Sequence, residues 1–152
     1  VGSCLCRGRP EPHAFVLRDL SGHMSPNEWA RSAVAAYKHY EADRIVAEVN
    51  FGGAMVEATL RAVERALPFR ALRASRAKAV RAEPVAALYE ERQGKVHHVG
   101  GFPELEDQLT HWVPGMLPSP DRLDALVWAV TDLMLSGQNP WRLPAEPIVT
   151  YR

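Results

Sequence analysis

The sequence lacks the features of a membrane protein or of a small disulfide-stabilised one. It has 2 cysteines among its 152 residues, Cys4 and Cys6. Two cysteines are too few for a cysteine framework, and nothing nearby completes a cysteine-based metal site. We therefore expect reduced thiols. No apolar run approaches the ~18 residues that a transmembrane helix needs, so we expect no membrane partner.

Net charge is also missing, because 18 Lys and Arg residues balance 18 Asp and Glu residues. No overall field attracts a polyanion, so any nucleic-acid site must be a local patch. The sequence has no Gly-Lys-Ser/Thr phosphate loop and no Gly-x-Ser-x-Gly motif, which argues against a Walker NTPase and a serine hydrolase. A composition of 47% hydrophobic and 24% charged residues is typical of one globular domain with a sizeable core.

Hydrophobic periodicity predicts an α/β chain. Two strands come first and form a hairpin, and helices then alternate with strands. We predict a mixed sheet with helices on its faces, because strand–helix–strand units favour parallel pairing. The domain spans 1–139, and the proline-rich stretch 140–152 is predicted to be an extended tail. The expected strands are 1–7, 13–19, 45–49, 69–74 and 95–99, and the expected helices are 25–41, 55–67, 83–92, 104–112 and 121–137.

One stretch of this pattern, 120–129, combines a helix start with paired carboxylates. Pro120 and Asp121 suit the first positions of a helix. Asp124 follows three residues later, so both acids share one face of the first turn. An apolar stripe at helical spacing would hold Asp124 at the edge of a core: Leu123, Leu126, Val127 and Val130. The alternative is an N-cap together with an ordinary first-turn acid, which interacts favourably with the positive end of the helix dipole.

A second carboxylate, Glu48, interrupts the apolar strand 45–49. A buried acid is unfavourable unless it is paired or binds a cation. Ligands of open α/β sheets lie at the carboxyl ends of strands, where Glu48 is. Glu48 and Asp124 would bind Mg²⁺ or Mn²⁺, and carboxylates within about 8 Å would suit two ions about 4 Å apart. The alternative is a salt bridge from Glu48 to Arg44 or Lys78.

A basic run follows the next strand, with no acid from Arg70 to Arg81. It contains Arg70, Arg73, Arg76, Lys78 and Arg81. Such a run could bind phosphates, or it could be a solvated surface segment. Lys78 and Arg81 are nearest the next helix and so are best placed to face a site.

Three segments together resemble one family. They are Ile-Val-Ala-Glu-Val-Asn-Phe-Gly-Gly at 45–53, the basic segment with its helix at 73–90, and Ser-Pro-Asp-Arg-Leu-Asp-Ala-Leu-Val-Trp-Ala at 119–129. They look like the C-terminal nuclease domain of the terminase large subunit of tailed phages, prophages and gene-transfer agents. The resemblance covers about 13–137. It implies an RNase H-like fold and a metal-dependent endonuclease that cuts concatemeric double-stranded DNA during phage genome packaging.

The resemblance also assigns roles. Glu48 and Asp124 match acidic ligands of a Mg²⁺ or Mn²⁺ site, in which two ions are expected, and Asp121 is adjacent. The implied partners are double-stranded DNA, the terminase ATPase domain, the small terminase subunit and the portal. The implied location is the cytoplasm of the bacterial host. The expected DNA-binding residues are Arg73, Arg76, Lys78 and Arg81.

Two departures from the family pattern change what we expect. The Walker motifs of the ATPase motor are absent, so this chain would not translocate DNA. The family's first strand, of the Val-Asp-Pro type, carries an acidic ligand, and it is not found here; Asp19 is a poor substitute. We therefore expect an RNase H-like sheet that lacks its first strand, with weak metal binding and weak cleavage. The alternatives are a catalytically crippled module for DNA binding or packaging assembly, and an unrelated α/β enzyme.

Overall fold

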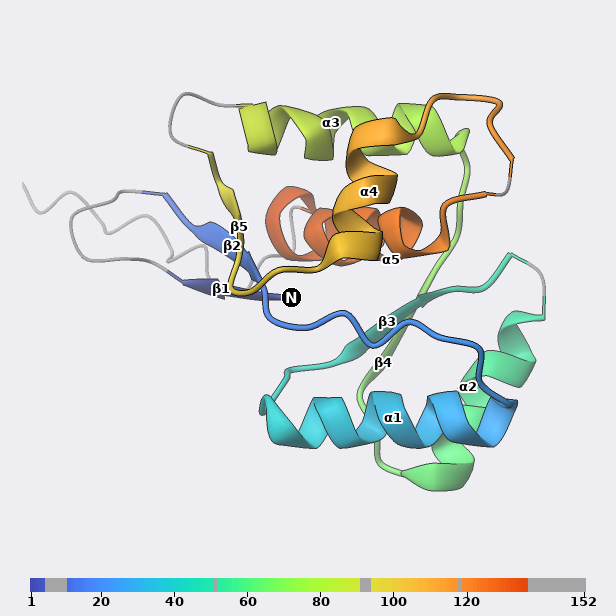
Figure 1. Cartoon of the computed structure of the whole chain (residues 1–152). Helices are drawn as coiled ribbons and strands as arrows, with labels where there is room; N and C mark the ends of the chain where they lie inside the picture. The colour runs from blue at the N-terminus through green and yellow to red at the C-terminus, as the bar shows by residue number, and fades with distance from the viewer. Residues whose placement is uncertain (5–10, 51, 91–93, 118, 137–152) are drawn as a thin grey trace, which may run out of the picture.

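The computed structural model describes residues 1–4, 11–50, 52–90, 94–117 and 119–136. Strands and helices alternate along the chain as the periodicity predicts (Figure 1). The expected strand end at 5–7 and the expected tail 140–152 lie outside the described residues. The elements are β1 (Gly2–Cys4), β2 (His13–Val16), α1 (Pro26–His39), β3 (Ile45–Glu48), α2 (Gly53–Val63), β4 (Phe69–Leu72), α3 (Lys78–Glu90), β5 (Val96–His98), α4 (Pro103–His111), α5 (Asp121–Val130) and a π-helical turn, η1 (Thr131–Leu135).

The strands pair both ways, as a mixed sheet requires. β1 is antiparallel to β2, which confirms the predicted pairing of the first two strands, and β2 is parallel to β5. β3 and β4 form a separate parallel pair. Helices α1 and α2 lie on one side of β3 and β4, and α3, α4 and α5 lie on the other (Figure 1). The α/β class with helices on both faces is therefore confirmed.

The described strands leave the sheet interrupted between β1 and β3. A cavity of about 400 Å³ lies between them, and its lining includes Gly2 and Ser3 of β1 and Ile45 and Val46 of β3. The apolar run of β3 predicts a fully buried strand, but all four of its residues are only half-buried. The reason is that β3 has just one hydrogen-bonded neighbour, β4, among the described strands.

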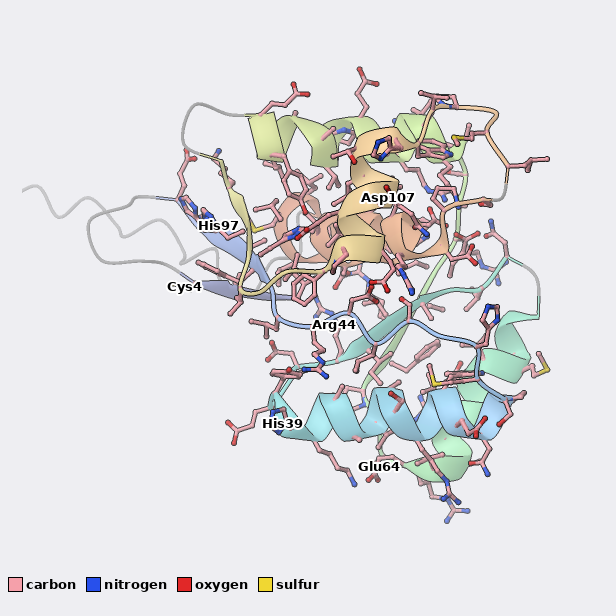
Figure 2. All side chains as sticks on the ribbon, viewed as in Figure 1. Cys4, His39, Arg44, Glu64, His97 and Asp107 are labelled. Atoms are coloured by element: carbon pink, nitrogen blue, oxygen red, sulfur yellow. The ribbon has the colours of Figure 1, made fainter. Side chains whose placement is uncertain are left out.

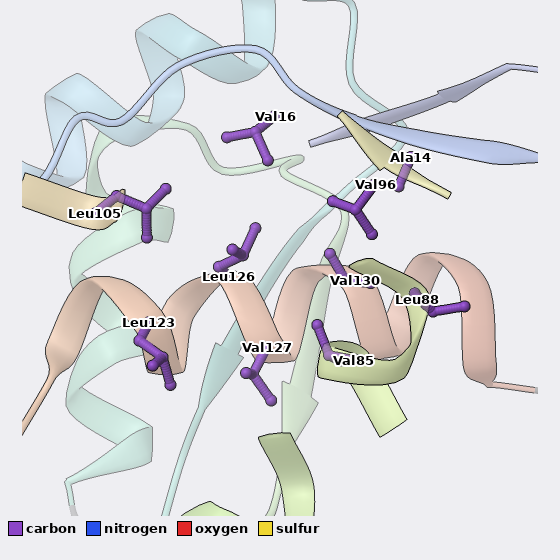
Figure 3. Close-up of a cluster of buried hydrophobic side chains, with 10 residues drawn as sticks. All are labelled: Ala14, Val16, Val85, Leu88, Val96, Leu105, Leu123, Leu126, Val127 and Val130. Carbon is purple, nitrogen blue, oxygen red and sulfur yellow. The ribbon is translucent and has the colours of Figure 1, made fainter. Parts of the chain in front are cut away.

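The larger core is built around α5 (Figure 3). All four residues of the apolar stripe predicted for this helix are buried: Leu123, Leu126, Val127 and Val130. It packs against α3 through Val85 and Leu88, and against β2 and β5. Burying each such side chain contributes about 1.5–3 kcal/mol, so this stripe fixes the position of the whole α5 helix, including its first turn. A second core joins α1 and α2 through Ala30, Val34, Leu60 and Leu67.

Helix α3 begins at Lys78, five residues before the predicted start at 83. The sequence Glu83-Pro84 resembles a helix start, because proline is favoured at the first helical position. Pro84 instead lies inside the helix, where it forgoes one backbone hydrogen bond. As a consequence, Lys78 and Arg81 lie three residues apart on one face of a first helical turn, and not in a loop.

A chain of three polar side chains fixes β5 between two helices. The hydroxyl of Tyr89 in α3 lies 2.9 Å from Nε2 of His98, and Nδ1 of His98 lies 2.9 Å from Oε1 of Glu106 in α4. The ionised carboxylate can only accept, so Nδ1 of His98 donates to it, and in the neutral ring Nε2 then accepts from Tyr89. The hydrogen bond from His98 lowers the pKa of Glu106. Burial, with a smaller contribution from Glu106, raises the pKa of Tyr89 to about 12.

A buried acid, Asp132, connects η1 to the β3–β4 pair through two ion pairs. It is 7% exposed and accepts from Arg44, at the start of β3, at 2.9 Å. It also accepts from Arg70 of β4. Arg44 lies between α1 and the helices on the opposite side (Figure 2). Arg44 directly precedes β3 and Arg70 belongs to β4, so one carboxylate fixes how that pair sits against η1.

Asp132→Ala is expected to lower the free energy of unfolding by about 1.5–2 kcal/mol, measured by urea denaturation. This is the low end for charged hydrogen bonds, because both arginines are partly exposed and regain water. Asp107→Ala is the matched control, since its pair with His111 is exposed on both sides and should change stability by less than about 0.5 kcal/mol. Equal stability of the two variants would contradict a structural role for Asp132.

Candidate active site

Two acids from different elements meet at one guanidinium group. Glu48 ends β3, and Asp124 lies in the first turn of α5. The Nη2 atom of Arg81 lies 2.7 Å from Oδ1 of Asp124 and 3.6 Å from Oε2 of Glu48. The two oxygens are therefore no further apart than the sum of those distances, which is inside the span of about 8 Å that suits two ions.

Trp128 holds Glu48 from a second direction. Its indole Nε1 donates to Oε2 of Glu48 at 2.8 Å. The guanidinium carbon of Arg81 lies 4.6 Å from the centre of the Trp128 ring, which is a cation–π contact. Sequence reasoning missed Trp128. Its position four residues after Asp124 could have indicated that Trp128 belongs to the site, because this spacing places both residues on one face of α5.

Lys78 belongs to the same group of side chains. Its Nζ donates to the Ser119 hydroxyl at 2.6 Å and lies 3.5 Å from Oδ2 of Asp124. Asp124 thus has both basic residues of the α3 first turn beside it, and its backbone N–H bonds to the carbonyl of Pro120 within the helix. Asp124 is not the N-cap, so a capping role alone does not explain its position.

Neither partner predicted for Glu48, Arg44 or Lys78, is the cation found beside it. Arg44 pairs with Asp132 and not with Glu48. Lys78 pairs with Asp124. The cation beside Glu48 is Arg81, which sequence reasoning assigned to DNA. Two acids and two bases therefore balance in this cluster, and the side chains of all four are between 13% and 30% exposed.

The structure separates the other sequence candidates from this centre. Asp121 is exposed at the first position of α5. Arg73 and Arg76 are exposed on the segment between β4 and α3, and the carbonyl of Arg76 accepts from Nη1 of Arg81 at 2.9 Å. Arg70 forms an ion pair with Asp132, so its charge is not part of the exposed basic segment. The solvent-facing basic surface is thus shorter than the sequence run.

The turn after Glu48 is held firmly. The side chain of Asn50 accepts from the backbone N–H of Ala74 at 2.9 Å and donates to its carbonyl at 3.4 Å. The backbone N–H of Val49 donates to the carbonyl of Leu72 at 2.9 Å. These contacts join the ends of β3 and β4. Glu48 and the basic segment after β4 therefore stay side by side.

The donor set suits a hard divalent cation in part. Carboxylate oxygens are what Mg²⁺ and Mn²⁺ prefer, and Mg²⁺ commonly uses one or two carboxylates with water and substrate phosphates. Glu48 and Asp124 provide two such groups. Within the described ranges, no group of three or more His, Cys, Asp or Glu side chains is placed to hold a metal ion. Arg81 also contacts both carboxylates in this geometry.

This α/β fold presents paired acids, from a strand end and an opposing helix, beside a basic helical turn, an arrangement consistent with an RNase H-like, nuclease-type domain. Residues 4–133 match the family model described as the terminase RNaseH-like domain, and the chain belongs to that family. The resemblance read from the sequence and the RNase H-like fold are thereby confirmed. No curated protein and no solved structure matches the chain. No helix in the part of the chain that the structure describes is long and apolar enough to cross a membrane.

Proposed function

We propose that this chain is a metal-dependent endonuclease domain that cuts concatemeric double-stranded DNA during phage genome packaging. The observation that carries the proposal is the convergence of Glu48 and Asp124 on Arg81. The two acids are 76 positions apart in the sequence, and the order of β3 and α5 in the fold brings them together. Family membership supports a nuclease-type role for this site.

In the proposed site, Glu48 and Asp124 hold Mg²⁺ or Mn²⁺. An ion bound there would supply an activated water and charge stabilisation for the leaving oxygen. Lys78 and Arg81 orient the phosphate to be cut, because their cationic groups lie beside both acids. Asp121 contributes from the solvent side, one turn before Asp124. Arg73 and Arg76 contact neighbouring phosphates of the duplex.

The second candidate is a catalytically crippled module that binds DNA or helps packaging assembly. Arg81 favours it, because this cation neutralises the carboxylates that a metal would need. In either case the proposed partners are double-stranded DNA, the terminase ATPase domain, the small subunit and the portal. The proposed location is the cytoplasm of the bacterial host.

A plasmid-nicking assay on this chain tests the proposal. Slow nicking that appears with Mn²⁺ or Mg²⁺ and stops with EDTA is the expected result. Nicking that continues in EDTA would contradict a metal-dependent site. Absence of nicking, with DNA binding retained in a gel-shift assay, would favour the crippled module.

DNA binding should depend on the exposed basic segment. The double variant Arg73→Ala/Arg76→Ala is expected to reduce the slope of log affinity against log salt by about 2, since each arginine neutralises about one phosphate. Fluorescence anisotropy of a labelled duplex at several salt concentrations measures this slope. The matched control is Arg31→Ala/Arg65→Ala, on the α1–α2 side, which removes the same charge. An equal loss in both would mean that binding follows total charge and not this surface.

A further inference from the structure

Arg81 has an unusual number of partners for a residue that is expected to meet DNA. Its Nη2 contacts Asp124 and Glu48, its Nη1 donates to the carbonyl of Arg76, and its guanidinium stacks on Trp128. The side chain is only 13% exposed. Its donors face inward, so in this geometry Arg81 interacts with the two acids and is not available to bind DNA.

The position of Arg81 is also the position that a divalent cation would need. A hard cation binds carboxylate oxygens at about 2.0–2.6 Å, closer than the hydrogen bonds seen here. An ion cannot occupy the space between Oδ1 of Asp124 and Oε2 of Glu48 while the guanidinium group of Arg81 fills it. Arg81 and the metal are therefore competitors for the same two carboxylates.

Arg81 keeps unused donor capacity. Its Nε is buried and has no hydrogen-bond partner among the described residues. A buried donor without a partner is unfavourable, so the resting contact is not the best that this side chain can make. A phosphate accepts two parallel hydrogen bonds from a guanidinium fork, including one from Nε. The backbone carbonyl of Arg76 lies beside Arg81, and the side chain of Arg76 is exposed to solvent.

From these contacts we propose that Arg81 is an exchangeable internal counter-ion that couples DNA binding to metal binding. Without DNA it neutralises Glu48 and Asp124 and excludes the cation. A DNA phosphate draws it away and frees both acids for the metal. This inference rests on the proposed function. Because coupling between two ligands is reciprocal, DNA must tighten metal binding by the same factor by which metal tightens DNA binding.

The test measures both affinities without following cleavage. Mn²⁺ binding is measured by the loss of the free-ion electron paramagnetic resonance signal, with and without a duplex, and duplex binding by anisotropy, with and without Mn²⁺. For the wild-type chain we expect weak Mn²⁺ binding alone and a gain of about 5–150-fold with DNA. Arg81→Met retains the apolar stem against Trp128 and removes the charge. It is expected to bind Mn²⁺ about tenfold more tightly than wild type without DNA, and to gain little when DNA is added.

Two further variants separate coupling from simple charge loss. Arg81→Lys keeps a cation but lacks the planar fork, so its coupling factor should fall below wild type. Arg76→Met should weaken duplex binding and keep the wild-type coupling factor. If Arg81→Met does not fold, as judged by thermal unfolding, Arg81→Lys decides the result. A wild-type coupling factor in Arg81→Lys would then overturn the proposal.

Failure of this inference differs from failure of the proposed function. Equal Mn²⁺ affinity with and without DNA, in both wild type and Arg81→Met, would overturn the coupling. If that affinity were lost in Asp124→Asn, the metal site itself would stand. Absence of Mn²⁺ binding in every chain and condition would overturn both the coupling and the metal site.

Discussion

Glu48→Gln and Asp124→Asn are each expected to lower metal-dependent DNA cleavage by about 10²–10³-fold. Each amide keeps the size of the acid but loses the charge that would hold the cation. The ion contributes several kcal/mol of charge stabilisation in the transition state, and each 1.36 kcal/mol corresponds to about tenfold in rate. Initial rates of plasmid nicking at saturating Mn²⁺ measure the effect.

Asp107→Asn is the control for this pair. Asp107 lies on the surface of α4, and its side chain is 71% exposed (Figure 2). The substitution therefore removes one negative charge without altering the site. Asp121→Asn should fall between the control and the two main variants, because Asp121 is exposed and contributes only from the solvent side. Full activity in Asp124→Asn, with none lost in Glu48→Gln, would mean that the acids of the nuclease lie elsewhere in the chain.

The two variants also separate the candidate functions. In an active nuclease they remove cleavage and leave duplex binding in place, since the bases of the α3 first turn remain. In the crippled module there is no cleavage to remove. Loss of the Asp124 charge releases Lys78 and Arg81 in both cases, so duplex binding is expected to be retained or strengthened, and cleavage is the readout that separates the two candidates.

Features of the fold that depend on local patterns were predictable from the sequence. The stripe of α5 is buried because its apolar residues recur at helical spacing, whatever they pack against. Ser25 is the N-cap of α1, and its backbone N–H and its hydroxyl both donate to the carboxylate of Glu28, the spacing of a capping box. The proximity of Glu48 and Asp124 followed from the strand-end rule together with the family resemblance, and their catalytic role is still a prediction.

Features that depend on contacts between distant residues were not predictable. Trp128 bonds Glu48 across 80 positions, and Asp132 bonds Arg44 across 88. No period in the sequence encodes such pairs. The start of α3 was missed for a different reason. A proline normally marks a helix start, but here the packing of Val85 and Leu88 in the core stabilises a helix that continues through Pro84. That extra turn is what places Arg81 at the acids.

Gly53→Ala is expected to lower the free energy of unfolding by about 3 kcal/mol, the upper end for overpacking a closed space. A Cβ on residue 53 would lie 2.1 Å from Cβ of Val49 and 2.9 Å from its Cγ1. These atoms cannot stay in place. Val49 has little freedom to move, because its backbone N–H is bonded to Leu72 at the end of the β3–β4 pair. Urea denaturation measures the loss.

The clash at Gly53 should also reach the site, because Val49 directly follows Glu48. A shift of Val49 moves the Glu48 carboxylate away from Arg81 and Trp128, so Gly53→Ala should weaken Mn²⁺ binding as well as stability. Gly101→Ala is the matched control, since nothing lies within 4 Å of the Cβ it would add. Equal stability of the two variants would show that the turn after β3 can relax. Glu48 would then be positioned by Trp128 and Arg81, and not by the backbone that carries it.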